Sequence, residues 1–164
     1  MAAGRVAVID SSVVIALVAV DQLHLLDAFF SEVRVPLEVY QHELAAKRAA
    51  KEPDELRRLS RITMELHVHP VPDAASMLGR GEQQAIAAAL AHDAMLLVDE
   101  RRARRVAQEL HIEVRGTLGI LLEGKRRGLI PLVGPFVAEL LRGGFRLSDD
   151  LVRSVLQAAG ESVP

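Results

Sequence analysis

The sequence lacks several residue types on which common folds and sites depend. Its 164 residues contain no cysteine and no tryptophan, and aromatic residues make up only 3% of the chain. The absence of cysteine excludes a disulfide framework and any metal site built on thiolates. With so few aromatic residues, the core must consist mainly of leucine, valine, isoleucine and alanine.

Long apolar runs are missing as well. The longest uninterrupted one, Val13–Val20, is far shorter than the roughly 18 residues that a membrane-spanning helix needs. The charge is nearly balanced, with 20 basic and 22 acidic residues, so any binding to nucleic acid must come from local patches. We expect a soluble protein of the cytoplasm that has no membrane partner.

The chain does contain an alternation of short apolar runs with amphipathic segments. Strands are expected at Arg5–Asp10, Glu32–Pro36, Leu66–His69, Met95–Asp99 and Ile112–Arg115. Helices are expected at Val13–Ala19, Leu23–Phe30, Val39–Ala50 (prolonged by Lys51–Ser60), Glu82–His92, Arg101–Leu110, Leu118–Arg127, Phe136–Leu141 and Leu151–Ala158. This pattern predicts an α/β fold with three layers, α/β/α, around a short central parallel sheet of about five strands. The length suits one domain over residues 1–164, with the helices within about 134–160 packing on it or on a second subunit.

Two aspartates each follow a strongly apolar run. Asp10 ends the run that starts at Arg5, and Asp99 ends the run that starts at Ala94. Buried parallel strands read as continuous apolar runs, and ligands bind beyond their carboxyl ends. Carboxylates that meet there repel one another unless a proton or a cation intervenes. The sequence therefore predicts an acidic metal site at this edge of the sheet.

Two glutamates occur where they could share that site. Glu43 lies in the first turns of the helix after the second strand, and Glu82 lies at the start of a later helix. Each acid also has a simpler explanation: Glu82 can serve the helix dipole, Glu43 can be a solvated charge, and a strand-end aspartate can cap a helix. Together, three or four carboxylates without cysteine suit Mg²⁺ or Mn²⁺ rather than Zn²⁺. Ser12 could add a hydroxyl near the metal, although capping of the first helix by Ser11 or Ser12 is the simpler role.

Other chemistries of acidic sites fit the residues less well. Ser12 occupies the place at which a haloacid-dehalogenase-type phosphotransferase has its second aspartate, and no glycine-rich nucleotide loop follows a strand. No pair of histidines has the spacing of a zinc protease. His67 and His69 would share one face of the expected strand and could bind a metal, but a surface pair is the simpler interpretation.

Several short motifs, in their order and spacing, resemble those of the PIN-domain family, the nuclease fold of VapC-type toxins. The likeness is greatest to an uncharacterised bacterial and archaeal branch of that family. The matching stretches cover nearly the whole chain and are Val8–Leu17, Val35–Pro36, Val39–Tyr40, Glu43–Leu44, Gly81–Ala87, Leu97–Ala107, Gly116–Gly119, Lys125–Pro131 and Gly144–Ser148.

The resemblance implies a Mg²⁺- or Mn²⁺-dependent ribonuclease. Its catalytic acids fall on Asp10, on Glu43, on Glu82 (where such toxins more often carry aspartate) and on Asp99, with Glu100 as an alternative or additional metal ligand. Ser11 and Ser12 take supporting positions. The resemblance also implies a toxin of a type II toxin–antitoxin pair, with RNA as substrate, a small antitoxin protein as partner and a homodimer as the common state.

A basic cluster follows the fourth acid directly. It consists of Arg101, Arg102, Arg104 and Arg105. These arginines could hold RNA phosphates, or some could pair with neighbouring glutamates; we expect Arg101 or Arg102 to be structural and the others to be more exposed. Other basic pairs, such as Lys47–Arg48, are expected on solvated helix faces.

Two alternatives to a ribonuclease stay open from the sequence. The first is a non-catalytic PIN-like module that binds RNA or a partner protein. The second is a flap-type nuclease acting on DNA, which is disfavoured because the chain has no insertion that would arch over DNA.

Overall fold

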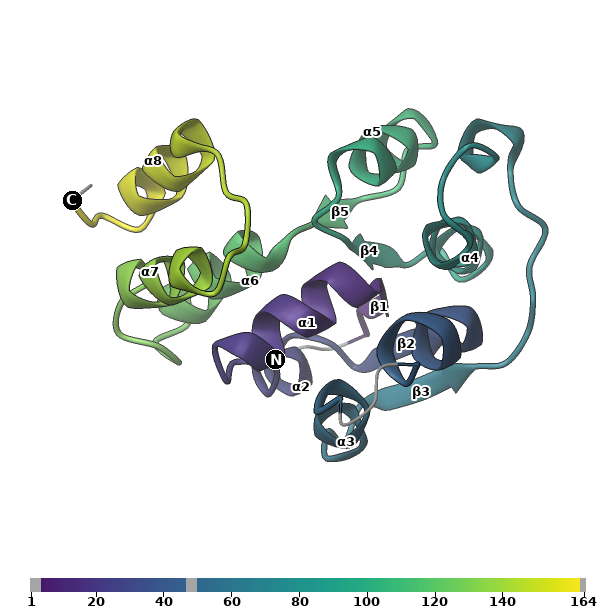
Figure 1. The fold of residues 1–164 in the computed structure, drawn as a ribbon, viewed down its shortest axis with the longest axis horizontal. Helices are drawn as coiled ribbons and strands as arrows, with labels where there is room; N and C mark the ends of the chain where they lie inside the picture. Colours follow the sequence, from purple (N-terminus) through teal and green to yellow (C-terminus); the bar gives the residue numbers. More distant parts are fainter. Residues whose placement is uncertain (1–3, 47–49, 163–164) are drawn as a thin grey trace.

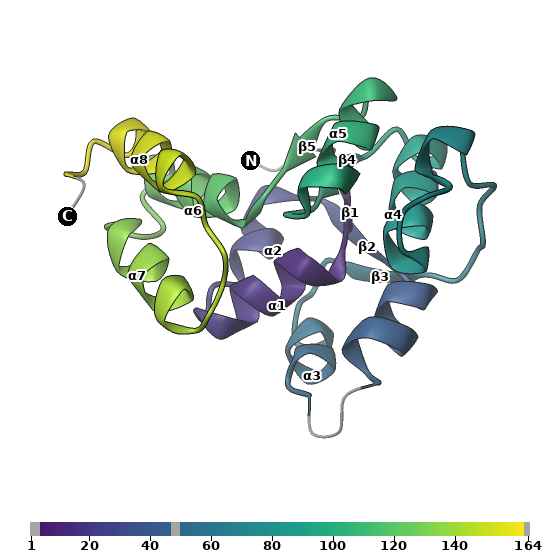
Figure 2. The same ribbon diagram turned by 45° about the horizontal axis from the view of Figure 1, so that its top comes forward.

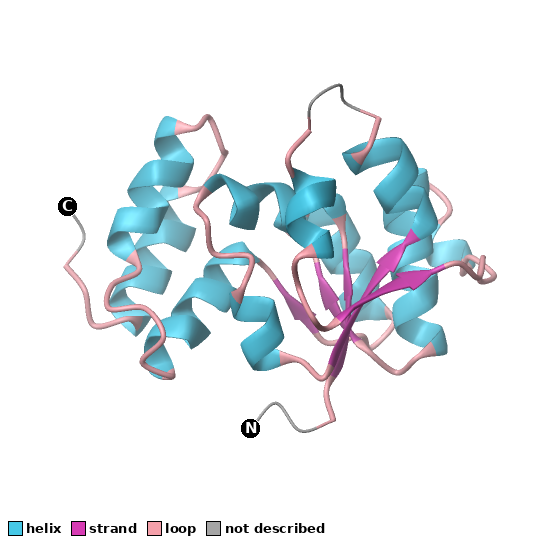
Figure 3. Cartoon of the chain, turned by 90° about the horizontal axis from the view of Figure 1, so that it is seen from below, coloured by secondary structure: helices cyan, strands magenta, loops and turns pink. Residues whose placement is uncertain are grey.

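Five parallel strands form one sheet in the computed structural model, which describes residues 4–46 and 50–162. The sheet order is β3-β2-β1-β4-β5. The strands are β1 (Val6–Ile9), β2 (Glu32–Pro36), β3 (Ile62–Glu65), β4 (Met95–Leu97) and β5 (Val114–Arg115). Figure 3 shows the strands between helices on both faces, which confirms the predicted three-layer α/β architecture.

Two hydrophobic clusters, one on each face of the sheet, build the core. On the first face lie α1 (Ser11–Ala19), α2 (Leu25–Phe29), α3 (Glu52–Arg57), α6 (Thr117–Arg126), α7 (Gly134–Arg142) and α8 (Asp149–Ala158). The second face is covered by a 3₁₀ turn, η2 (Asp73–Ala75), and by α4 (Arg80–Ala91) and α5 (Arg101–Glu109). Central β1 is buried from both sides because its alternate side chains enter the two clusters: Ala7 and Ile9 the first, Val8 the second.

The C-terminal helices gather at one end of the molecule. Figures 1 and 2 both show α6, α7 and α8 side by side, away from β3. Val137 and Leu140 of α7 and Val155 of α8 belong to the same buried cluster as Leu17 of α1. Among the helices of the described ranges, none combines the length and the apolar character that crossing a membrane requires.

The prediction of a strand at Leu66–His69 is wrong. The strand there, β3, is Ile62–Glu65, and it pairs with β2 so that Glu65 lies opposite Pro36. Ile62 and Met64 pack against the core from this strand. Leu66 and Val68, in contrast, are 67% and 72% exposed, so the alternation of residues 66–69 reflects no buried face.

The prediction of one long helix from Val39 to Ala50 is also wrong. A single π-helical segment, η1 (Val39–Leu44), is present, and the Ala45 N–H donates to the Tyr40 carbonyl five residues earlier, at 2.8 Å. A separate helix, α3, follows. The predicted solvated pair Lys47–Arg48 lies outside the described residues. Short π-helical turns occur frequently at functional sites, and η1 carries Glu43.

The segment after α8 is tied back to α7 by one carboxylate. Glu161 accepts hydrogen bonds from the Val133 and Gly134 N–H groups, at 2.7 and 2.8 Å, and pairs with Lys125 at 2.8 Å. These N–H groups belong to the start of α7, where a helix has free donors and a positive dipole end. Burial alone would raise the pKa of Glu161, yet these partners hold it below its ordinary value of 4.5.

Replacing Glu161 with alanine is expected to lower the free energy of unfolding by about 1–3 kcal/mol, because the two N–H groups lose their acceptor. The loss should be full at neutral pH. It should shrink as the pH falls below 4.5 and through the lower pKa of the folded state, since protonated Glu161 no longer provides the stabilisation. Urea unfolding at several pH values measures both effects. The exposed Glu139 of α7 gives the control, and an equal loss in Glu139→Ala would contradict this role.

Candidate active site

Asp10 lies at the junction between β1 and α1 and caps the helix. Its Oδ2 accepts hydrogen bonds from the Ser12 N–H at 3.3 Å and from the Ser12 hydroxyl at 2.8 Å. The predicted capping of this helix by Ser11 or Ser12 is therefore wrong, because both serines lie inside α1 and Asp10 is the cap. A backbone hydrogen bond from the Asp10 N–H to Leu97 O, at 2.9 Å, holds the junction against β4.

The Asp10 carboxylate is buried in a way that opposes its charge. The residue is 3% exposed, and its Oδ1 is buried with no hydrogen-bond partner among the described residues. Burial raises the pKa of Asp10 above its ordinary value of 3.8, and the charge of Asp99 raises it further, although the contacts with Ser12 act in the opposite direction. A divalent cation would give Oδ1 the partner it lacks, so this residue fits a metal ligand.

Asp99 follows β4 and is held by the start of α6. Its Oδ1 accepts from the Thr117 N–H at 2.8 Å, and its Oδ2 accepts from the Thr117 hydroxyl at 2.6 Å. The Asp99 N–H donates to the Ser12 hydroxyl at 3.1 Å. The same hydroxyl donates to Asp10, so Ser12 links the two strand-end aspartates. Thr117 was not among the predicted site residues, although it lies in the matching stretch Gly116–Gly119, because its contact with Asp99 depends on the tertiary fold.

Glu43 reaches the site from η1 and rests against the first turn of α4. A Cβ at Gly81 would collide with the Glu43 carboxylate, so only glycine lets the helix and this side chain approach so closely. Burial raises the pKa of Glu43, and the charges of Asp10 and Glu38 add to the rise, while Ser11 and the Gly81 N–H oppose it. The Ser11 side chain therefore acts on Glu43, while its backbone acts on Asp10 together with Ser12.

Glu82 has a structural role and is also near the other acids. Its Oε2 accepts from the Gly79 N–H at 3.0 Å, which satisfies a free donor at the start of α4. Burial raises the pKa of Glu82, and the hydrogen bond from the Gly79 N–H lowers it by less. The charges of Asp10, Glu100 and Glu43 add to the rise. A structural role of Glu82 at the start of α4, the simpler explanation from the sequence, accounts for this hydrogen bond. It does not account for the negative charges of Asp10, Glu100 and Glu43 around Glu82.

Glu100 caps α5, and its Oε2 accepts from the Ala103 N–H at 2.8 Å. The two candidates for the fourth acid act on different neighbours: the charge of Asp99 raises the pKa of Asp10, whereas that of Glu100 raises the pKa of Glu82. We call the five carboxylates the acidic cluster; its members are Asp10, Glu43, Glu82, Asp99 and Glu100.

The acidic cluster is more open than a tight metal cage. Within the described ranges, Glu65, His69 and His92 form the only group of three or more candidate ligands whose atoms all lie within 4.8 Å of one another. A wider spacing is compatible with Mg²⁺, which usually keeps several waters and takes only one or two carboxylates.

A cavity of about 860 Å³ borders the acidic cluster at Asp99, and Ser12 lines it as well. It lies between α5, the start of α6 and the segment that leads into α8. Five arginines line it: Arg101, Arg104, Arg105, Arg115 and Arg146. The last two were not predicted to bind RNA, although Arg146 lies in the matching stretch Gly144–Ser148, because only the fold brings their parts of the chain beside α5.

The basic cluster is arranged differently from the prediction. Arg101 and Arg102 are exposed, and Arg104 is the half-buried one, whose Nη1 donates to the Val98 carbonyl at 3.2 Å. Arg102 does not line the cavity. In the part of the chain that the structure describes, no ion pair joins these arginines to a neighbouring glutamate. The arginines of the basic cluster are therefore available to an anionic ligand.

A five-stranded parallel sheet between helices, with carboxylates beyond the carboxyl ends of β1 and β4, defines a three-layer α/β domain. A family model described as "PIN domain" matches residues 6–161, and the chain belongs to the PIN-domain family. A solved structure, a PilT N-terminus domain protein from the hyperthermophilic archaeon Sulfolobus solfataricus P2, is similar with 15% identity and a TM-score of 0.49. That match covers 72% of this chain and 92% of the archaeal one. Among curated proteins, no relative matches the sequence.

Replacing Gly81 with alanine is expected to displace Glu43 with little effect on the fold, because the new Cβ meets only the end of a flexible side chain. Mn²⁺ affinity, followed by electron paramagnetic resonance, should fall by roughly 10–100-fold, the usual loss when support of a metal ligand is removed. Gly79→Ala is the matched control, since a Cβ there lies 3.5 Å from Glu82 Oε2, an ordinary contact. Unchanged Mn²⁺ binding in Gly81→Ala would exclude Glu43 from the site.

Proposed function

We propose that this PIN-domain protein is a metal-dependent endoribonuclease that hydrolyses RNA phosphodiesters. The observation that carries the proposal is the buried Asp10 carboxylate: one of its oxygens lacks a partner among the described residues, and burial together with the charge of Asp99 raises its pKa. Asp10, Glu43, Glu82 and Asp99 would hold Mg²⁺ or Mn²⁺, and Glu100 would assist beside Glu82.

Each residue has a distinct task in this proposal. A divalent ion in such a site activates water and neutralises the charge that develops on a phosphodiester. Asp10 supplies the free Oδ1, and Ser12 keeps its other oxygen fixed. Thr117 fixes the orientation of Asp99 by two hydrogen bonds. These contacts hold the acids in place before any ligand arrives, so little reorganisation is needed at reaction.

The arginine-lined cavity is suited to the RNA backbone. Its arginines lie next to the acidic cluster, and guanidinium groups bind phosphate through charge-assisted, bidentate hydrogen bonds. Such contacts position a nucleic acid without reading its sequence. With 3% aromatic residues, the chain offers few platforms for base stacking, so recognition of the backbone is favoured over recognition of bases.

The cellular role we propose is that of the toxin in a type II toxin–antitoxin pair. A small antitoxin protein would cover the acidic cluster, and the active form would be a cytoplasmic homodimer. Membership of the PIN-domain family supports this part of the proposal.

A second candidate is a non-catalytic PIN-like module that binds RNA or protein. One observation favours it: four of the five carboxylates already accept hydrogen bonds from N–H groups at helix starts. These are Asp10 with Ser12, Glu82 with Gly79, Asp99 with Thr117, and Glu100 with Ala103. In this alternative the carboxylates serve the fold, and the arginine-lined cavity alone binds the ligand.

Cleavage of a pool of short RNAs, with EDTA, Mg²⁺ or Mn²⁺, separates the two candidates. Wild type should cleave only with metal, and Asp10→Asn should lower the rate by at least about 100-fold, which corresponds to the several kcal/mol that a metal site supplies. Asparagine also caps helices well, so the fold should be kept. A matched set of DNA oligonucleotides should be cleaved far less.

Two arginine variants test the substrate path in the same assay. Arg105→Ala removes a cavity-lining arginine and should raise KM several-fold, whereas Arg102→Ala, outside the cavity, should leave it nearly unchanged. Metal-dependent cleavage by Asp10→Asn at the wild-type rate would contradict the nuclease proposal. RNA binding by folded wild type without cleavage under any metal would support the second candidate instead.

A further inference from the structure

A network of charged and polar side chains lies between the sheet and α4, on the side of β2 and β3. Arg34 of β2 pairs with Glu32 at 3.1 Å and with Glu65 of β3 at 3.1 Å. The residues on either side of Arg34, Val33 and Val35, belong to the first hydrophobic cluster. Because side chains alternate along a strand, Glu32 and Arg34 lie on the face toward α4, opposite the apolar face of Val33 and Val35.

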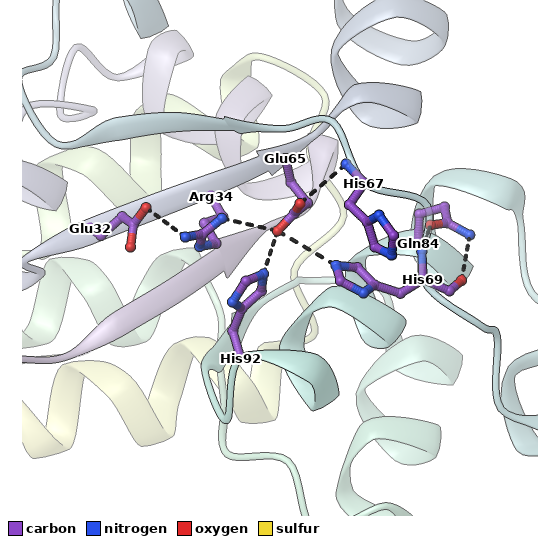
Figure 4. Close-up of polar contacts among 7 residues, drawn as sticks. All are labelled: Glu32, Arg34, Glu65, His67, His69, Gln84 and His92. Carbon is purple, nitrogen blue, oxygen red and sulfur yellow. Dashed lines mark hydrogen bonds and ion pairs between the residues drawn. The ribbon is translucent and has the colours of Figure 1, made fainter.

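Two histidines converge on the same carboxylate oxygen in this network. His69 Nε2 lies 3.6 Å from Glu65 Oε2, and His92 Nε2 contacts that oxygen as well (Figure 4). One atom of each of the three residues lies within 4.8 Å of the other two. The residues come from three places: the end of β3, the segment after it and the end of α4.

One of these ligand atoms has no hydrogen bond. His69 Nε2 is buried and is without a hydrogen-bond partner among the described residues, and the His69 side chain is 13% exposed. A buried imidazole nitrogen that lacks a partner costs free energy comparable to a lost hydrogen bond. A metal ion bound to this nitrogen would remove that cost.

We propose that Glu65, His69 and His92 form a binding site for a divalent transition-metal ion of the Zn²⁺ type. Two imidazoles and one carboxylate are a donor set that suits Zn²⁺ and its neighbours, whereas Mg²⁺ prefers oxygen ligands alone. Ligand bonds of about 2.0–2.2 Å require donor atoms roughly 3–3.5 Å apart, close to the spacing of Glu65 Oε2 and His69 Nε2. Water would complete the coordination.

The surrounding contacts hold the ligands in place. The Gln84 amide of α4 accepts from the His69 N–H at 3.3 Å and donates to the His69 carbonyl at 3.4 Å. The His67 N–H donates to Glu65 Oε1 at 3.2 Å, and Arg34 Nη1 donates to Oε2 at 3.1 Å, so both oxygens are held in position while Oε2 faces the two imidazoles. The His69 ring packs edge-to-face against those of His67 and His92, with centroids 4.6 and 5.5 Å away. Such support of ligands is typical of metal sites and raises their affinity.

The site is distinct from the acidic cluster, with which it shares no residue. A metal ion here would join the segment after β3 to the end of α4, whose first turn carries Glu82. The expected role is therefore structural, because binding to the folded state alone stabilises it by mass action. The competing explanation is that Arg34 and His92 neutralise Glu65 and that no metal binds.

Zinc binding by the tag-free full chain, stripped with EDTA, tests the proposal. Zn²⁺ is titrated against a chromogenic chelator in the presence of excess Mg²⁺, which occupies oxygen-only sites. Wild type should bind one Zn²⁺ per chain, and His69→Gln and His92→Gln should each weaken binding by more than about 100-fold, since outer contacts alone are worth 10–100-fold. Zn²⁺ should also raise the Tm of wild type but not of these two variants.

Two control variants separate this site from other sources of Zn²⁺ binding. His24→Gln alters an exposed histidine elsewhere, and Asp10→Asn alters the acidic cluster; both should bind Zn²⁺ as wild type does. Circular dichroism of each metal-free variant checks the fold. The two ligand substitutions, His69→Gln and His92→Gln, lie on different elements, and a single variant that keeps the fold is enough to test the site. Zn²⁺ binding that is absent in wild type, or unchanged in a folded His69→Gln or His92→Gln, would overturn the proposal.

Discussion

The crowding of carboxylates at the carboxyl edge of the sheet is the constraint on which the site depends. Asp10 must lie there because it ends the central strand and caps α1, and burial together with neighbouring charge raises its pKa. A protein gains no stability from an ionised carboxylate in such a place unless a cation or a proton compensates it. The unfavourable electrostatics of this edge are therefore the strongest physical indication of a metal-binding function.

The surrounding residues make the crowding possible. Ser12 links the strand-end aspartates, Thr117 holds Asp99, and the absent side chain of Gly81 makes room for Glu43. Asp99 lines the arginine-lined cavity, so negative and positive charge lie side by side there. This arrangement suits a polyanionic substrate, because the arginines attract it and the carboxylates hold the cation beside which it reacts.

The sequence predicted what depends on local pattern. The apolar runs before Asp10 and Asp99 indicated buried strands, and with them the sheet edge and its acids. It failed where the pattern was ambiguous: the alternation at Leu66–His69 is an exposed segment after β3. Thr117 and Arg146 lie in matching stretches, but their places beside Asp99 and in the cavity, like that of Arg115, depend on contacts between distant parts of the chain that a local pattern does not show.

Thermal unfolding of wild type and Asp10→Asn, with and without Mg²⁺ at neutral pH, tests the central claim most directly. Because the pKa of Asp10 is higher in the folded state than its ordinary value of 3.8, the ionised carboxylate lowers the free energy of unfolding. The loss is complete above the raised pKa and absent below 3.8. We predict that Asp10→Asn melts higher than wild type without metal, by roughly 2–4 °C for each kcal/mol that burial of the charge and repulsion by Asp99 cost the wild type. Mg²⁺ should raise the Tm of wild type only. A lower Tm for metal-free Asp10→Asn, with equal stabilisation of both proteins by Mg²⁺, would contradict the claim.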